Sequence, residues 1–208
     1  MIRPALVLVL LAVLAAPSAR AATAPSTAKV TPGVVTDSLA ILERMVAKDS
    51  TKADVLYRLG VMYLDREKNA EAAQVFARGI KARPKDVKML VNLGIALDNL
   101  SRSEEAQDFY RQAMTAAPND SIASCRLATS LYAQGKFAES MDLLRTIIAK
   151  QPRAHCAFFT MGVAFADAGL YRDAIRMWKR VVEFAPASPE ATSAKESIEV
   201  LERFLAGK

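Results

Sequence analysis

VKMLVNLGIALDNLSRSEEAQDFYRQAMTAAPND, residues 87–120, is the stretch that decides the fold of this chain. Its small residues Gly94 and Ala106 let two helices approach closely, and the large Tyr110 fills the space toward a neighbouring unit. Pro118 has no backbone N–H to donate and disfavours helix in the residue before it, so it ends the second helix and fixes the next turn. The stretch therefore predicts two packed helices followed by a turn.

The same pattern returns with a period of 34 residues, which is typical of a repeat protein. An acidic residue opens the second helix of each block, where it complements the helix dipole, and Gly135 and Gly169 mark the turn between the two helices in the last two blocks. Asp86, Asp120 and Ser188 stand where a helix N-cap is needed. The four blocks are 53–86, 87–120, 121–154 and 155–188. Corresponding places hold Gly60, Gly94, Ala128 and Gly162; Ala72, Ala106, Ser140 and Ala174; Phe76, Tyr110, Leu144 and Trp178; and Pro84, Pro118, Pro152 and Pro186.

These columns resemble the tetratricopeptide repeat over residues 53–188, in four full units. The resemblance implies an all-α fold, a right-handed α-solenoid of stacked helix-turn-helix repeats. The first helix of each unit is then expected to line the concave face and the second helix the convex face. Residues 36–52 are expected to form the helix of an N-terminal half-repeat. Residues 189–208 carry apolar residues at helical spacing with charges on the other side, which predicts a C-terminal capping helix.

Residues 1–21 read as a secretory signal peptide. Arg3 supplies the positive start, and residues 5–16 form an apolar run that is too short to span a bilayer. A small-residue cleavage site ends at Ala21, so we expect a periplasmic or secreted protein. An uncleaved N-terminal helix that anchors the chain is the alternative. Residues 22–35 are rich in Ala, Thr and Pro and are expected to be a flexible linker.

The charge balance is mildly basic. The formal net charge is +6, and removing Arg3 and Arg20 with the leader leaves 26 basic against 22 acidic residues. Charges of both signs alternate along the chain, whereas binding to nucleic-acid phosphates needs a basic stripe on one face. We therefore expect no nucleic-acid partner, and no stable membrane span after the signal peptide is removed.

In the tetratricopeptide family, fixed places on each first helix line a groove that binds a peptide or protein partner. Carried onto this chain, those places give a mixed surface that could bury the apolar anchors of an extended or helical peptide. Asn92 is expected to bond the peptide backbone and Arg126 to bind a carboxylate with both prongs of its guanidinium. Asp54, Asp98 and Asp167 fall on the same helix faces. The predicted groove residues are Tyr57, Val61, Lys88, Asn92, Ile95, Arg126, Thr129, Tyr132, Phe159 and Val163.

The family's carboxylate clamp for chaperone tails is incomplete in this sequence. Asn92 and Arg126 match it. Tyr57, Val61 and Ile122, however, stand where the clamp needs Lys, Asn and Lys. Binding of a chaperone tail in that mode is therefore not expected.

Cys125 and Cys156 are the two cysteines of the chain, and both fall on the concave side of consecutive first helices. In an oxidising compartment such a pair can form a disulfide, provided that both side chains face inward and their Cα atoms lie about 5.5–6 Å apart. Two buried free thiols are the alternative. The sequence leaves both open.

The sequence gives little support to catalysis. His155 is the one histidine, and it opens the first helix of the fourth block, where a surface or capping role is expected. No phosphate-cradling glycine loop or hydrolase motif occurs, and we expect no metal site and no cofactor. The sequence thus favours a protein-interaction scaffold that binds a peptide or protein in its groove, with a role in envelope assembly as one setting. A structural, self-associating repeat protein without a groove ligand is the alternative.

Overall fold

The computed structural model describes residues 38–207, and this range contains ten α-helices and no strand. The all-α solenoid predicted from the sequence is confirmed. The predicted signal peptide, 1–21, and the predicted linker, 22–35, lie outside the described residues. The helices are α2 (Ser38–Lys48), α3 (Ala53–Asp65), α4 (Asn69–Ala82), α5 (Val87–Asn99), α6 (Ser103–Ala116), α7 (Ser121–Ala133), α8 (Phe137–Lys150), α9 (His155–Asp167), α10 (Tyr171–Phe184) and α11 (Pro189–Ala206).

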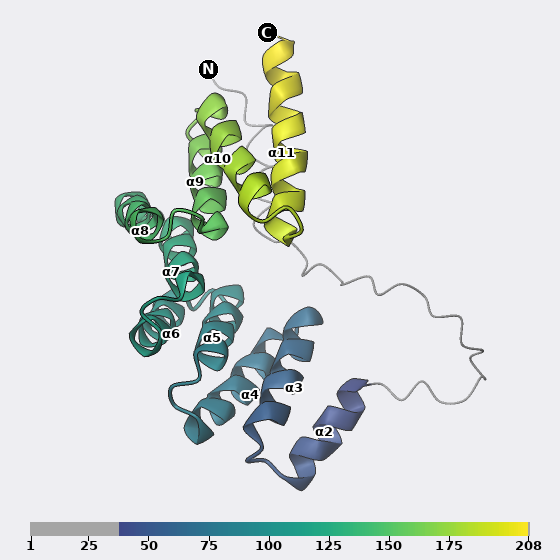
Figure 1. Cartoon of the computed structure of the whole chain (residues 1–208). Coiled ribbons are helices and arrows are strands. Elements are labelled where there is room, and N and C mark those ends of the chain that lie inside the picture. Colours follow the sequence, from purple (N-terminus) through teal and green to yellow (C-terminus); the bar gives the residue numbers. More distant parts are fainter. Residues whose placement is uncertain (1–37, 208) are drawn as a thin grey trace, which may run out of the picture.

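The helices follow an arc from α2 at one end to α11 at the other (Figure 1). Helices α3 to α10 form four antiparallel pairs, and each second helix also packs on the first helix of the next pair. The first helices α3, α5, α7 and α9 contact one another in succession, whereas successive second helices touch at most marginally. The first helices therefore line the inner side of the arc, and α6 and α8 lie on its outer side (Figure 1).

Three helices begin at the capping residues predicted from the sequence. The side chains of Asp86, Asp120 and Ser188 accept hydrogen bonds from backbone N–H groups in the first turns of α5, α7 and α11, at 3.2, 2.8 and 3.1 Å. Each bond satisfies a donor that has no partner within the helix. The first helices α3 and α9 have no such cap, because they follow Lys52 and Ala154, whose side chains cannot accept a hydrogen bond.

The turn between the two helices of each pair requires one residue in the left-handed region. Gly135 and Gly169 occupy it at φ +76° and +75°, as the sequence predicted for the last two pairs. In the first two pairs Glu67 and Ser101 adopt the same conformation, at φ 59° and 60°. The turn geometry is therefore shared, but only two of the four turns have the residue type that adopts it without strain.

Exchanging these residue types should change stability in opposite directions. We expect Ser101→Gly to raise the free energy of unfolding by about 0.5–1 kcal/mol, because the side chain's steric cost in the left-handed region is removed. Gly135→Ser should lower it by a similar amount, and because no atom lies within 4 Å of a Cβ built there, strain is the only cause. Urea denaturation followed by circular dichroism measures both. Shifts of the same sign in the two variants would contradict this account.

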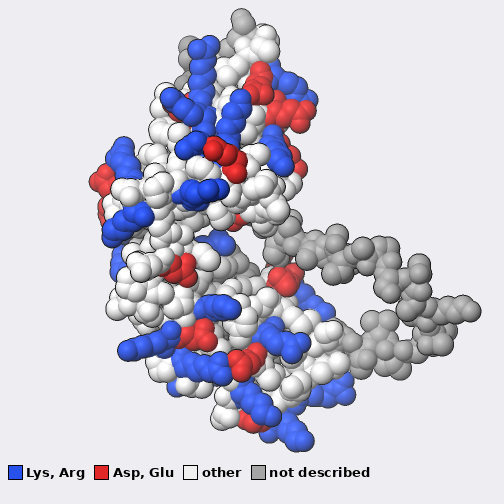
Figure 2. Space-filling model, in the orientation of Figure 1, with Lys and Arg blue, Asp and Glu red and all other residues white. Residues whose placement is uncertain are grey.

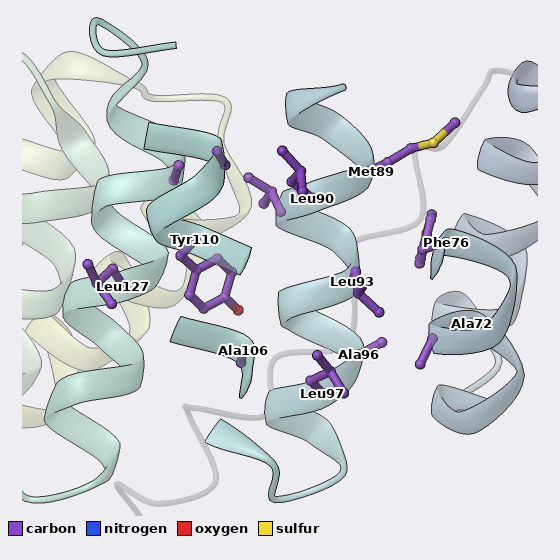
Figure 3. Packing of buried hydrophobic residues seen from close by; sticks show 14 of the residues in the cluster. Ala72, Phe76, Met89, Leu90, Leu93, Ala96, Leu97, Ala106, Tyr110 and Leu127 are labelled. Carbon is purple, nitrogen blue, oxygen red and sulfur yellow. The ribbon is translucent and has the colours of Figure 1, made fainter. Parts of the chain in front are cut away.

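The core is continuous from α3 to α7 and is built on the repeated columns. Helix α5 sends apolar side chains toward both neighbours, with Met89 and Leu93 near Phe76 of α4, and Leu90 and Leu97 on the other side (Figure 3). In three of the four pairs, a large ring of the second helix packs on a glycine of its partner helix. A Cβ built on these glycines would fall on the ring, which pairs Gly60 with Phe76, Gly94 with Tyr110 and Gly162 with Trp178.

The third pair is packed differently. Its small residue is Ala128 and its large residue is Leu144, so a methyl group and an aliphatic side chain replace the glycine and ring. Ser140, which is fully buried, donates a hydrogen bond of 2.7 Å to the carbonyl of Ala128 and so satisfies its hydroxyl. The pair α7–α8 is thus closed by smaller groups than its neighbours.

Charged side chains of both signs are interspersed over most of the face drawn in Figure 2. Within the described range, six ion pairs join side chains three positions apart in the sequence. Five lie within a helix or at its start, and one lies between α2 and α3. Such exposed pairs add little stability, and they neutralise neighbouring charges. No helix in residues 38–207 is long and apolar enough to cross a membrane.

Candidate partner-binding groove

The predicted groove residues lie on the four first helices. Tyr57 and Val61 come from α3 and pack on the first core cluster with Ile95 of α5. Phe159 of α9 and Tyr132 of α7 pack on the second cluster, which continues to α11. All five side chains are half-buried, so one part of each supports the core and the other part faces solvent. They form the apolar floor of the candidate groove.

Two cations lie above this floor. Lys88 on α5 and Arg126 on α7 are exposed, and neither forms an ion pair with another described residue. Asn92, one turn after Lys88, donates its side-chain amide to the Lys88 carbonyl at 2.8 Å. That bond holds the Asn92 side chain along its own helix and leaves its Oδ1 as an acceptor for a backbone N–H.

Val163 does not fit the predicted groove. Its exposed fraction is 3%, and it lies within the second core cluster with Trp178 and Val181 of α10. The physical reason is that α10 and α11 both contact α9, so an apolar residue at this place is enclosed by their side chains. Val163 is therefore a core residue and is removed from the candidate site.

A shallow open depression of about 470 Å³ lies where α3 meets the start of α5. Asp54 on one side of it forms a two-pronged ion pair with Arg83, with N–O distances of 2.6 and 3.1 Å. The Arg83 guanidinium holds the pKa of Asp54 below its usual value through this hydrogen bond and its charge. The depression is lined by Asp54, Tyr57, Arg83, Asp86, Val87 and Lys88.

Sequence reasoning missed Arg83 because the family pattern places groove residues only on first helices. Arg83 lies in the turn after α4, directly before the proline column. The sequence does show a basic residue at the end of the first block. A turn residue at this place lies beside the next first helix, so its charge could have indicated a contribution to the site.

Contacts between α7 and α9 tie the far end of the groove together. The Thr129 and Thr160 hydroxyls share a hydrogen bond of 3.1 Å, and the Tyr132 hydroxyl donates to Asp167 Oδ2 at 2.7 Å. Burial, followed by the bond to Asp167, raises the pKa of the Tyr132 hydroxyl. Thr129 and Tyr132 therefore connect α7 to α9, and this structural role takes precedence over contact with a ligand.

The structure joins Cys125 and Cys156 in a disulfide, with their Cα atoms 6.0 Å apart. This separation falls within the range that a disulfide requires. The bond connects α7 and α9 on the same side as the threonine and tyrosine contacts.

Asp98 at the end of α5 serves the packing of the middle pairs. Its two oxygens accept hydrogen bonds from the hydroxyls of Tyr110 and Ser130, each at 2.9 Å. Ser130 and Tyr110 are buried, and burial with the Asp98 charge raises the pKa of Tyr110. Both carboxylate oxygens of Asp98 already accept a hydrogen bond within the protein, so Asp98 is a weaker candidate for ligand contact than Lys88 or Arg126.

Comparison with known families agrees with this architecture. Sequence profiles of the tetratricopeptide repeat match residues 35–87, 57–121 and 101–157. Together they cover more than half of the sequence, and the chain belongs to the tetratricopeptide repeat family. Proteins of this family are typically non-enzymatic scaffolds that bind peptides or proteins.

Solved structures show the same fold at low identity. A crystal structure of MamA is 18% identical with a TM-score of 0.59, and the match covers 70% of this chain and 85% of that one. YrrB, described as a TPR protein with an unusual peptide-binding site, is 23% identical with a TM-score of 0.54, over 76% and 81% of the two chains. TTC0263, a thermophilic TPR protein of Thermus thermophilus, is 14% identical with a TM-score of 0.65, over 77% and 88%. The comparison with curated proteins gave no match.

Proposed function

We propose that this chain is an exported scaffold that holds a peptide or protein segment in the groove on the inner side of its arc. The observation that carries the proposal is the pair of exposed cations, Lys88 and Arg126, above a floor of half-buried apolar side chains. Concave surfaces of repeat solenoids are the usual binding surfaces of such proteins. The signal-like segment at residues 1–21 supports export to the periplasm or the exterior. Envelope assembly is one setting for such a scaffold.

The groove favours an extended peptide that carries an acidic group. Its apolar side chains can pack on the floor near Ile95 and Phe159, while Asn92 Oδ1 accepts a backbone N–H. Arg126 can bind a carboxylate through two parallel hydrogen bonds, and Lys88 adds a second positive charge. This chemistry needs no cofactor, and the proposed partner is a protein, with no role for nucleic acid.

Self-association without a groove ligand is the second candidate function. Both ends of the arc expose large apolar side chains, with Ile41 and Met45 on α2 at 41% exposure each and Val200 on α11 at 51%. Contact between the two ends of different copies would cover these residues. Mass measured by light scattering over a range of concentrations tests this candidate, and a constant monomer mass counts against it.

Affinity capture from a native envelope extract tests the groove. We expect Asn92→Glu/Arg126→Glu to lose at least nine-tenths of the partner that the parent protein captures, because two acidic groups would repel the peptide's carboxylate and remove its hydrogen bonds. Gln112→Glu/Arg111→Glu is the matched control, since it makes the same change of charge at exposed positions on the outer helix α6. Circular dichroism must show equal helicity in all three proteins.

The three outcomes of the capture are distinct. Loss in the groove variant alone supports the proposal. Equal capture by both variants moves the recognition surface away from the inner side of the arc. Equal loss in both variants assigns the interaction to net charge and also counts against the groove.

A further inference from the structure

Three side-chain contacts, spaced along the two helices, connect α7 to α9. Cys125 is bonded to Cys156, Thr129 to Thr160 one turn later, and Tyr132 to Asp167 near the helix ends. No other adjacent pair of first helices in the described range carries such a series, since α5 and α7 share only the Ser130–Asp98 bond. Helices α7 and α9 are therefore joined by more covalent and polar side-chain contacts than the other neighbouring first helices in the described range.

The weak packing near this junction lies between α8 and α9. Helices α7 and α9 themselves contact each other at least as extensively as the other neighbouring first helices do. Helix α8 buries only Ser140, Leu144 and Ile147, and it makes the weakest contact with the following first helix of any second helix. The local cluster consists mainly of small groups and separates the two large clusters of the chain. Its buried members are Cys125, Ala128, Leu144, Ile147, Ala154 and Ala157.

We propose that the Cys125–Cys156 disulfide is a redox-controlled lock that holds the two halves of the arc as one rigid body. With the bond formed, α7 and α9 are fixed side by side. With the bond reduced, α9 keeps its hydrogen bonds and apolar contacts with α7 but packs only weakly on α8, and the contact between α8 and α9 opens locally.

The lock can be opened by a dithiol reductant. Cys156 is half-buried, whereas Cys125 is 4% exposed, so we expect the attacking thiolate to choose Sγ of Cys156. The S–S bond breaks, Cys125 leaves as a thiolate and takes up a proton, and a mixed disulfide forms on Cys156. The reductant's second thiolate then attacks its own sulfur in that mixed disulfide and releases Cys156, which is also protonated. Two electrons pass to the protein sulfurs, and the dithiol becomes a disulfide.

The lock controls the groove if the proposed function is correct. Arg126 directly follows Cys125 on α7, and Phe159 lies three residues after Cys156 on α9. The disulfide therefore fixes the spacing between a charged and an apolar element of the candidate site. Reduction should weaken binding of a peptide that contacts both helices, and this consequence rests on the proposed function.

Hydrogen exchange detected by mass spectrometry tests the lock without any ligand. The full chain is compared in its oxidised form, after dithiothreitol, and as Cys125→Ser/Cys156→Ser. We expect exchange in α8 and the first turns of α9 to rise at least tenfold on reduction and in the variant, with α3 to α6 changed less than twofold. Dithiothreitol should have no effect on the variant, which controls for the reagent. Alkylation should modify the two cysteines only after reduction.

Each result decides the question. A local rise confined to the α7–α9 junction supports the lock. Unchanged exchange, an equal rise in all helices, or alkylation of both cysteines before reduction overturns it. This measurement needs no partner, so the lock can be supported even if the groove binds nothing. If the groove binds a peptide equally well in both redox states, the lock still stands, and only its proposed effect on binding is refuted.

Discussion

Trp178→Ala is expected to lower the free energy of unfolding by about 3–5 kcal/mol, which is the range for removing a large buried aromatic side chain. Trp178 is fully buried in the second core cluster, where it packs on Gly162. Its indole N–H donates a hydrogen bond to the Phe159 carbonyl at 3.2 Å, and the substitution also removes this hydrogen bond. Urea denaturation followed by circular dichroism is the suitable measurement, because the chain has one tryptophan and the variant loses its fluorescence.

Phe137→Ala is the matched control for Trp178→Ala. Phe137 is also aromatic and lies at the start of a second helix, but it is 54% exposed. Its removal should cost less than about 1 kcal/mol, since surface substitutions change stability little. Similar losses in the two variants would contradict the assignment of Trp178 as the residue that closes the fourth pair.

A double substitution in the second pair should show strong coupling. Gly94→Ala alone should destabilise the protein by about 1–3 kcal/mol, because the new methyl group falls on the Tyr110 ring. Tyr110→Leu alone should cost about 2–4 kcal/mol, because it leaves space beside Gly94 and removes the hydrogen bond to Asp98. Combined, the two substitutions reproduce the natural pair Ala128 and Leu144 of the third unit.

The double variant is therefore expected to be more stable than the sum of the single losses predicts, by about 1 kcal/mol or more. The leucine leaves room for the methyl group that the tyrosine ring excludes. Measurement of all four proteins by urea denaturation gives the coupling energy directly. Additive losses, within about 0.3–0.5 kcal/mol, would show that residues 94 and 110 do not share one packing constraint.

The sequence predicted the solenoid because each repeated column has one physical purpose. A small residue, a large residue and a proline at fixed places determine helix contact and turn position, and the close approach predicted at the small column is present at Gly162. The large residue was predicted to fill the space toward a neighbouring unit, whereas the Trp178 ring also packs on Gly162 of its own pair. The left-handed turns at Glu67 and Ser101 could not be predicted from residue type, because there the packed helices impose a conformation that the residue itself disfavours.

The candidate site was less predictable, because burial and pairing depend on neighbouring units. The pattern placed Lys88, Asn92 and Arg126 on the inner side of the arc, but it could not show that Val163 is enclosed by α10. It also gave no sign that Asp98 is committed to Tyr110 and Ser130. A linear pattern shows which helix carries a side chain, whereas the partners of that side chain often come from other units of the array.

Site-specific photocrosslinking in the native envelope tests the central claim, that the inner side of the arc holds a protein partner. A photoreactive phenylalanine analogue is placed at Lys88 on α5 or at Gln112 on α6, both of which are exposed. The account predicts a cross-linked product with another protein from position 88 and none from position 112. A product from position 112 alone, or one with the mass of two copies of this chain, would contradict it.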